Sequence, residues 1–137
     1  MQIRKIMPKS ITREGFSRYG RVIEYPERPK APKNKNLFKV IVRQPDHGWR
    51  IAYLVVRERS IDRLEQHPDS LESFEPVSGK GLIYLSTKKD PRRVECFYLD
   101  KPVILKKGIW HGVVALSADF DVKITENSKV KCIYWRL

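Results

Sequence analysis

The feature that most constrains the fold is a succession of short segments, rich in Val, Ile, Tyr and Phe, that starts at Leu37 and runs to the end of the sequence. Turn-forming residues, such as those at Val77-Ser78-Gly79-Lys80, separate these segments at close spacing. Branched and aromatic residues favour strands, and many short strands without helical patterns between them indicate an antiparallel sandwich or barrel. Strands are predicted near 37–43, 50–56, 60–67, 72–77, 80–86, 94–99, 102–106, 109–117, 119–125 and 129–135.

The N-terminal part of the chain contains the one segment that predicts a helix. Thr12 can cap a short helix over 13–19, and Gly20 is expected to end it. Ile11 and Phe16 lie where a hydrophobic staple places its two side chains. The proline-spaced, charged segment 26–36 then predicts an irregular loop, either a connector or a flap over a pocket.

At 137 residues the chain is long enough for one packed domain, which we expect to span residues 1–137. Cys96 and Cys132 stand far apart without a CxxC motif, and the first residues do not resemble a secretory leader, so a reduced, cytoplasmic location is expected. No apolar run is long enough for a bilayer span, so no membrane role is expected.

The formal net charge of +12 favours an anionic partner, which is either a small anionic substrate or a polyanion. The basic residues are scattered along the chain rather than gathered in one block. Aromatic residues beside basic ones, at Trp49-Arg50 and Tyr134-Trp135-Arg136, could stack on nucleic-acid bases, but their alternation is typical of packed strands. We therefore expect a small anionic substrate rather than nucleic acid.

Four acidic and histidine residues have a spacing that indicates a shared site. Glu65 and His67 are two residues apart on a predicted strand, so both side chains point to the same face. Glu72 follows five residues later, and Gly108-x-x-His111 supplies a second imidazole after a turn. The spacing resembles the two motifs of the cupin superfamily, with Glu65 in place of the first histidine.

Imidazole and carboxylate together suit a divalent Mn, Fe, Ni or Zn ion, so Glu65, His67, Glu72 and His111 are candidate ligands. A polar pocket without a metal is the alternative. His47, in the turn beside Gly48, is expected to be an exposed loop residue.

Longer segments resemble the ureidoglycolate lyase family. The block from Glu65-Gln66-His67-Pro68 to Phe74-Glu75-Pro76 carries most of the similarity, and it is supported by three further segments in the same order as in the family. These are Phe16-Ser17-Arg18-Tyr19-Gly20, Gly108-Ile109-Trp110-His111 and Asp119-Phe120-Asp121-Val122.

This resemblance implies a cupin-type antiparallel barrel or jelly roll, a homodimer, and a carbon–nitrogen lyase that releases urea from ureidoglycolate to leave glyoxylate. Such chemistry needs a base, an acid and a positive charge for the carboxylate. His67 and His111 are expected to exchange the protons, with Glu65 orienting an imidazole or binding the metal. The expected substrate-binding residues are Lys106, Trp110 and Ser70.

The sequence also departs from the family pattern near the expected site. Glu72 stands where the family usually has Gln, Lys106-Lys107 replaces a His-Arg pair, and Gly112-Val113 replaces a His-Pro pair. The alternatives that remain open are an enzyme acting on another small carboxylate and a noncatalytic binding module for a small molecule or nucleic acid.

Overall fold

A computed structural model of the chain describes residues 3–24, 26–27, 30, 41–42 and 47–137. Within these residues the backbone forms a 3-10 helix, a short α-helix and eleven strands. In chain order they are η1 (Ile3–Lys5), β1 (Pro8–Lys9), α1 (Arg13–Phe16), β2 (Gly20–Val22), β3 (Arg50–Val56), β4 (Arg63–Gln66), β5 (Glu72–Ser78), β6 (Gly81–Thr87), β7 (Asp90–Tyr98), β8 (Val103–Leu105), β9 (Trp110–Ala115), β10 (Phe120–Glu126) and β11 (Ile133–Arg136).

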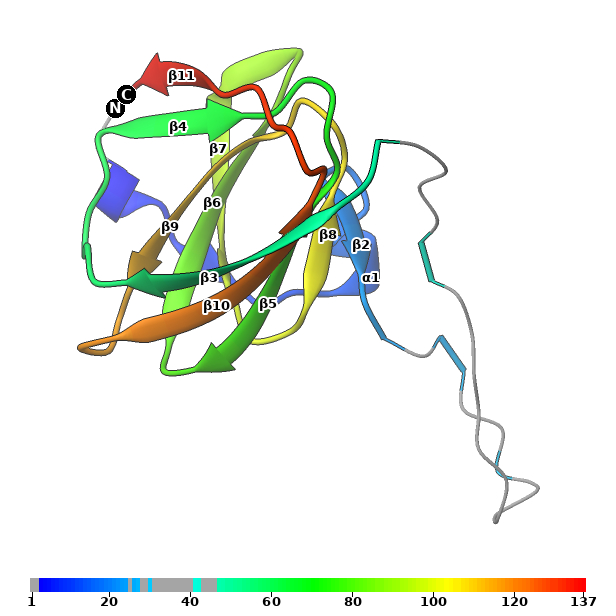
Figure 1. Cartoon of the computed structure of the whole chain (residues 1–137). Coiled ribbons are helices and arrows are strands. Elements are labelled where there is room, and N and C mark those ends of the chain that lie inside the picture. The colour runs from blue at the N-terminus through cyan, green and yellow to red at the C-terminus, as the bar shows by residue number, and fades with distance from the viewer. Residues whose placement is uncertain (1–2, 25, 28–29, 31–40, 43–46) are drawn as a thin grey trace.

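The strands form two sheets that pack against each other (Figure 1). One sheet has the order β1-β7-β6-β9-β4-β11, and the other has the order β2-β8-β5-β10-β3. All neighbouring strands are antiparallel except β1 and β7, which form a two-residue parallel pair. The predicted mainly-β, jelly-roll class is confirmed.

Most predicted strands are present with shifted ends. The strand expected at 50–56 has these bounds in the structure, whereas the one expected at 60–67 is shortened to β4. The strand expected at 94–99 begins earlier, at Asp90, because only Lys88 and Lys89 form the turn before it. Pro91 is tolerated there because β1 pairs with β7 only at Cys96 and Phe97, which leaves the early part of that edge unpaired.

The N-terminal helix is present but ends earlier than expected. Thr12 caps α1 by accepting a hydrogen bond from the Gly15 amide, as predicted, but the helix stops at Phe16. Gly20 does not end a helix; it is the first residue of β2. A Cβ at Gly20 would lie 1.8 Å from the carbonyl oxygen of Ile104, so the close approach of β2 to β8 requires glycine.

Two expectations fall mainly on residues outside the described part of the chain. The strand predicted at 37–43 is described only at 41–42, which are not in a strand. The loop predicted at 26–36 is described only at 26–27 and 30. Neither helix in the described residues is long and apolar enough to cross a membrane.

The middle of the six-stranded sheet, around β6, is buried on both faces. Along β6, Ile83 and Leu85 pack into the main core between the sheets, while Leu82 and Tyr84 pack into a second cluster on the opposite face. That second cluster also includes Ile3, from the N-terminal 3-10 helix, together with residues of the C-terminal strand. Burial of both faces explains why β6 is apolar along its length instead of alternating.

Candidate functional site

Three strands bring the four expected site residues together. Glu65 lies on β4 and His111 lies on β9, and the two residues are directly opposite each other in the antiparallel pairing of these strands. His67 follows the end of β4, two residues after Glu65, and faces the same side. The chain then crosses to the other sheet, where Glu72 begins β5. Glu72 therefore approaches the two histidines from the opposite wall of the barrel.

One carboxylate oxygen of Glu72 lies between the two imidazoles. Its Oε2 atom is 2.9 Å from His67 Nε2 and 3.1 Å from His111 Nε2. Glu65 Oε1 is farther away, at 3.6 Å from His111 Nε2. The side chains of His67, Glu72 and His111 are only 4–6% exposed, whereas that of Glu65 is 37% exposed. We call the three buried residues the inner cluster; Glu65 lies beside it, toward solvent.

The backbone fixes the orientation of both imidazole rings. His67 Nδ1 lies 3.1 Å from the carbonyl oxygen of Lys131, and His111 Nδ1 lies 3.0 Å from that of Ile109. A carbonyl oxygen only accepts, so each Nδ1 must carry the hydrogen and donate it. When either ring is neutral, its lone pair is therefore on Nε2, which points at Glu72.

Charge within the inner cluster shifts the pKa of every member. Burial favours the neutral form of His111, but the neighbouring Glu72 and Glu65 outweigh it and raise the pKa of His111 to about 10. Burial acts against ionised Glu72 as well, yet the two imidazoles lower the pKa of this carboxyl group to about 2. The pKa of His67 is also raised, because contact with Glu72 outweighs burial. An ion-paired cluster is thus favoured near neutral pH.

The turn at Gly108, just before His111, is hydrogen-bonded to His67. Gly108 has a φ of +76°, a conformation that a residue with a side chain rarely adopts. Its amide donates a hydrogen bond of 2.9 Å to the carbonyl oxygen of His67. The turn before His111 is therefore joined directly to the end of β4, which holds the two histidines in register.

Of the three expected substrate-binding residues, Lys106 and Ser70 lie beside the inner cluster and Trp110 does not. Lys106 and Ser70 line a small cavity against the inner cluster. The Ser70 hydroxyl is already used in local structure, since it donates to the Leu71 carbonyl and accepts from the Asn127 amide. Trp110 is not brought to the site, because its ring packs in the second hydrophobic cluster, 6.3 Å from that of Trp135. Neighbouring residues in a strand face opposite sides, so His111 points inward where Trp110 points outward. His47 is exposed, as expected.

Sequence reasoning missed two features beside the cluster. Arg50 on β3 donates two hydrogen bonds to Glu126 Oε1, and Glu126 is paired with Glu72 across β10 and β5. Cys132 lies just before β11, and it contributes to a second group in which the donor atoms of Glu65, His67 and Cys132 are all within 4.8 Å. The alternation of Ile124 and Glu126 on β10 could have suggested an inward Glu126, but the approach of Cys132 depends on strand pairing.

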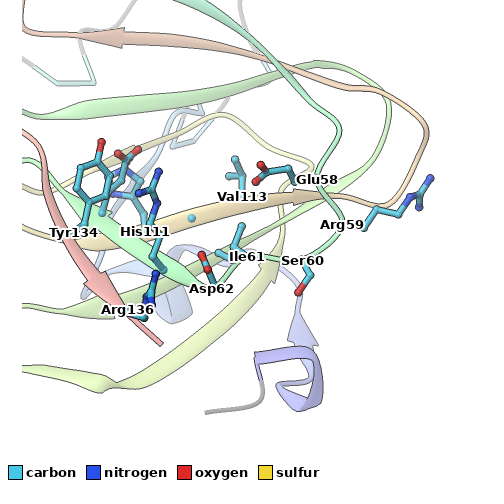
Figure 2. A pocket seen from close by; sticks show the side chains of 12 residues that line it. Glu58, Arg59, Ser60, Ile61, Asp62, His111, Val113, Tyr134 and Arg136 are labelled. Carbon is cyan, nitrogen blue, oxygen red and sulfur yellow. The ribbon is translucent and has the colours of Figure 1, made fainter.

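A pocket of about 780 Å³ opens beside the inner cluster (Figure 2). His111 and Glu65 line it, so they connect the buried cluster to solvent. Figure 2 shows Tyr134 and Arg136 close to His111, with Glu58 and Arg59 toward the other end. The remaining lining residues come from the segment before β4, from the start of β4 and from β9: Ser60, Ile61, Asp62, Arg63, Gly112 and Val113.

The inner cluster fits the requirements of a divalent metal ion. Its three donor atoms lie within 4.8 Å of one another. Two of these buried atoms, Glu72 Oε2 and His111 Nε2, have no well-aligned hydrogen-bond partner among the described residues despite their short separations. These atoms make ion-pair contacts of 2.9 and 3.1 Å but no aligned hydrogen bond in the described part of the chain, and a bound metal ion would satisfy them. Donation from Nδ1 to a carbonyl is also the usual second contact of a metal-bound histidine. The cluster could therefore hold a metal through two imidazoles and one carboxylate.

Comparison with known proteins supports the fold. No family model matches the sequence, and no curated protein matches it. Among solved structures, CapF in complex with 3-isopropenyl-tropolone has a TM-score of 0.56 at 18% identity, over 70% of this chain and 30% of CapF.

Two other solved structures give a similar result. The capsular polysaccharide assembling protein CapF from Staphylococcus aureus has a TM-score of 0.55 at 16% identity, over 77% of this chain and 34% of that one. QdtA, a sugar 3,4-ketoisomerase from Thermoanaerobacterium thermosaccharolyticum, has a TM-score of 0.51 at 13% identity, over 61% of this chain and 64% of QdtA. The alignments span about a third of CapF and just under two thirds of QdtA. The similarity shows the fold: the chain forms a cupin-like antiparallel β-barrel.

Proposed function

We propose that the chain is an enzyme that acts on a small carboxylate substrate at the inner cluster. The observation that carries the proposal is the convergence of His67, Glu72 and His111 on one point beneath an open pocket. Buried ionisable groups that shift one another's pKa values beside a cavity are typical of catalytic sites. The basic surface of the chain would favour approach of an anionic substrate.

A divalent ion held by the inner cluster would act as a Lewis acid toward a substrate oxygen. Mn, Fe, Ni and Zn all suit a site with two imidazoles and one carboxylate. Glu65 stays outside this set of ligands, since it lies beside the cluster and faces the pocket. Contact with His111 lowers the pKa of Glu65 despite partial burial, so this carboxylate is ionised and able to accept a proton at neutral pH.

The specific reaction that we propose is the release of urea from ureidoglycolate. The substrate hydroxyl gives its proton to Glu65, the oxygen forms a carbonyl, and the carbon–nitrogen bond breaks with its electron pair on nitrogen. Glu65 then passes the same proton to this nitrogen, so the products are glyoxylate and urea and the carboxylate is restored. One group serves as base and then as acid, which balances the protons without a further donor.

The resemblance of the segment from Glu65 to Pro76 supports this substrate, whereas Glu72, Lys106-Lys107 and Gly112-Val113 depart from the lyase pattern. A related small carboxylate is therefore the first alternative substrate. A binding module that holds such a carboxylate without converting it is the second alternative.

The test is a direct assay of urea release by protein loaded separately with Mn, Ni, Zn or Fe(II). Glu65→Gln should lower kcat by about 100-fold or more, since general acid–base catalysis contributes about 10² to 10⁴ in rate. Glu75→Gln, a change on β5 away from the cluster, is the matched control. Urea release that is unaffected by Glu65→Gln would disprove the role of Glu65, and binding of glyoxylate without turnover of any tested substrate would support the binding module.

A further inference from the structure

Two arginines face each other at the edge of the six-stranded sheet. Arg63 on β4 is directly opposite Arg136 on β11, and both line the pocket that leads to His111. Like charges directly opposite on neighbouring strands are destabilising. Both side chains are exposed, so water and salt screen part of this repulsion, and a bound anion would relieve the remainder; that anion can come from the protein or from a ligand.

The protein does not supply that anion within its described residues. Several other arginines have partners there: Arg50 pairs with Glu126, Arg57 pairs with Asp119, and Arg59 donates to the Leu116 carbonyl. For Arg63 and Arg136, no carboxylate of the described residues lies within 4.0 Å of either guanidinium group.

Three acidic residues also line this pocket, but none of them neutralises the arginine pair at contact distance. Glu65 is directed to His111, at 3.6 Å. Glu58 lies toward the other end of the pocket, near Arg59, and Asp62 precedes Arg63 in the chain (Figure 2).

Tyr134 orients one of the two guanidinium groups. The central carbon of Arg63 lies 4.5 Å from the centre of the Tyr134 ring, and stacking of this kind leaves the N–H groups free along the edge of the guanidinium plane. Tyr134 is itself opposite Glu65 in the pairing of β11 with β4. Arg63 and Arg136 are therefore two residues along β4 and β11 from Glu65 and Tyr134, and they lie on the same face of the sheet as Glu65.

We infer that Arg63 and Arg136, with Tyr134 beneath Arg63, form the binding site for the carboxylate group of the substrate. Guanidinium groups bind carboxylates through paired, charge-assisted hydrogen bonds. An anion bound at this place would have its reacting end toward Glu65 and His111. This assignment rests on the proposed function for the class of substrate, and it replaces Lys106, which lines the smaller cavity, as the group that holds the carboxylate.

The test is calorimetric titration with glyoxylate, its neutral amide, and inorganic phosphate. Arg63→Gln and Arg136→Gln should each weaken glyoxylate binding by about 10- to 100-fold, the range expected for a lost hydrogen bond to a charged group. Arg59→Gln removes the same charge from the far end of the pocket and should change the affinity less than twofold. The amide should bind weakly to all four proteins, and phosphate binding that exceeds glyoxylate binding would overturn the assignment to a carboxylate.

A second measurement separates binding from a structural role. Since the two arginines repel each other, Arg136→Gln should leave the thermal midpoint of the ligand-free protein unchanged or higher. A lower midpoint together with weaker binding would overturn the inference, as would equal glyoxylate affinity in all variants or no glyoxylate binding by the wild type.

Failure of the proposed anion site can be distinguished from failure of the proposed lyase activity. Arginine-dependent glyoxylate binding without any urea release would retain the anion site and reject the lyase activity. Urea release that depends on Glu65, with unchanged binding in both arginine variants, would reject the anion site and retain the activity.

Discussion

Replacing Glu72 with Gln tests the electrostatics of the inner cluster most directly. The change preserves the shape of the side chain but removes the charge that lies between the two imidazoles. In the folded protein the pKa of His111 is about 10, compared with 6.5 for an unperturbed histidine. At about 1.4 kcal/mol for each pH unit, this difference corresponds to at most about 5 kcal/mol of stability from His111.

The sign of the pH dependence follows from the raised pKa. Below pH 6.5 both the folded and unfolded proteins hold the proton on His111, so the stabilisation is fully present. It is lost as the pH rises from 6.5 through about 10, because only the folded protein keeps the proton over that range. Glu72 itself, with its pKa lowered from 4.5 to about 2, stabilises the fold above pH 4.5 and loses this effect as the pH falls through about 2.

The assay is urea unfolding at constant ionic strength between pH 6.5 and 10, with a chelator present so that no metal contributes. We expect the free energy of unfolding of the wild type to fall over this range, and the fall to be at least halved in Glu72→Gln. Glu65→Gln should have a smaller effect, because Glu65 is farther from His111 and more exposed. Parallel curves for the wild type and Glu72→Gln would refute the assignment of the raised pKa to Glu72.

Three further predictions concern the metal and the backbone. Addition of Mn, Ni, Zn or Fe(II) to chelator-treated protein should raise the thermal midpoint, and His67→Ala or His111→Ala should abolish that rise, whereas an equal rise in both variants would place the metal elsewhere. Gly108→Ala should cost about 1–2 kcal/mol in a urea melt, since φ there is +76°; an unchanged midpoint would contradict this. Gly81→Ala should lower the free energy of unfolding by about 3 kcal/mol, because the new Cβ would lie 2.1 Å from the ring of Phe120. A urea melt of this variant that matches that of the wild type would contradict the prediction.

Local sequence patterns predicted much of the barrel and part of the site. The alternation of side chains along a strand is a property of the backbone, so the shared face of Glu65 and His67 could be inferred without knowing their neighbours. The same rule places Trp110 and His111 on opposite faces, and its application to this pair would have kept Trp110 out of the site. The cap at Thr12 is equally local, since it involves an amide only three residues away.

The sequence alone thus determined a mainly-β barrel and brought Glu65 and His67 to one face. Only the tertiary structure decided that Glu72 lies between the histidines, because this depends on the crossing of the chain from one sheet to the other. It also placed Arg63 opposite Arg136, through the pairing of β4 with a C-terminal strand some seventy residues away. Strand partner and register come from contacts between distant segments, and a shift of one residue would have turned each of these side chains to the other face.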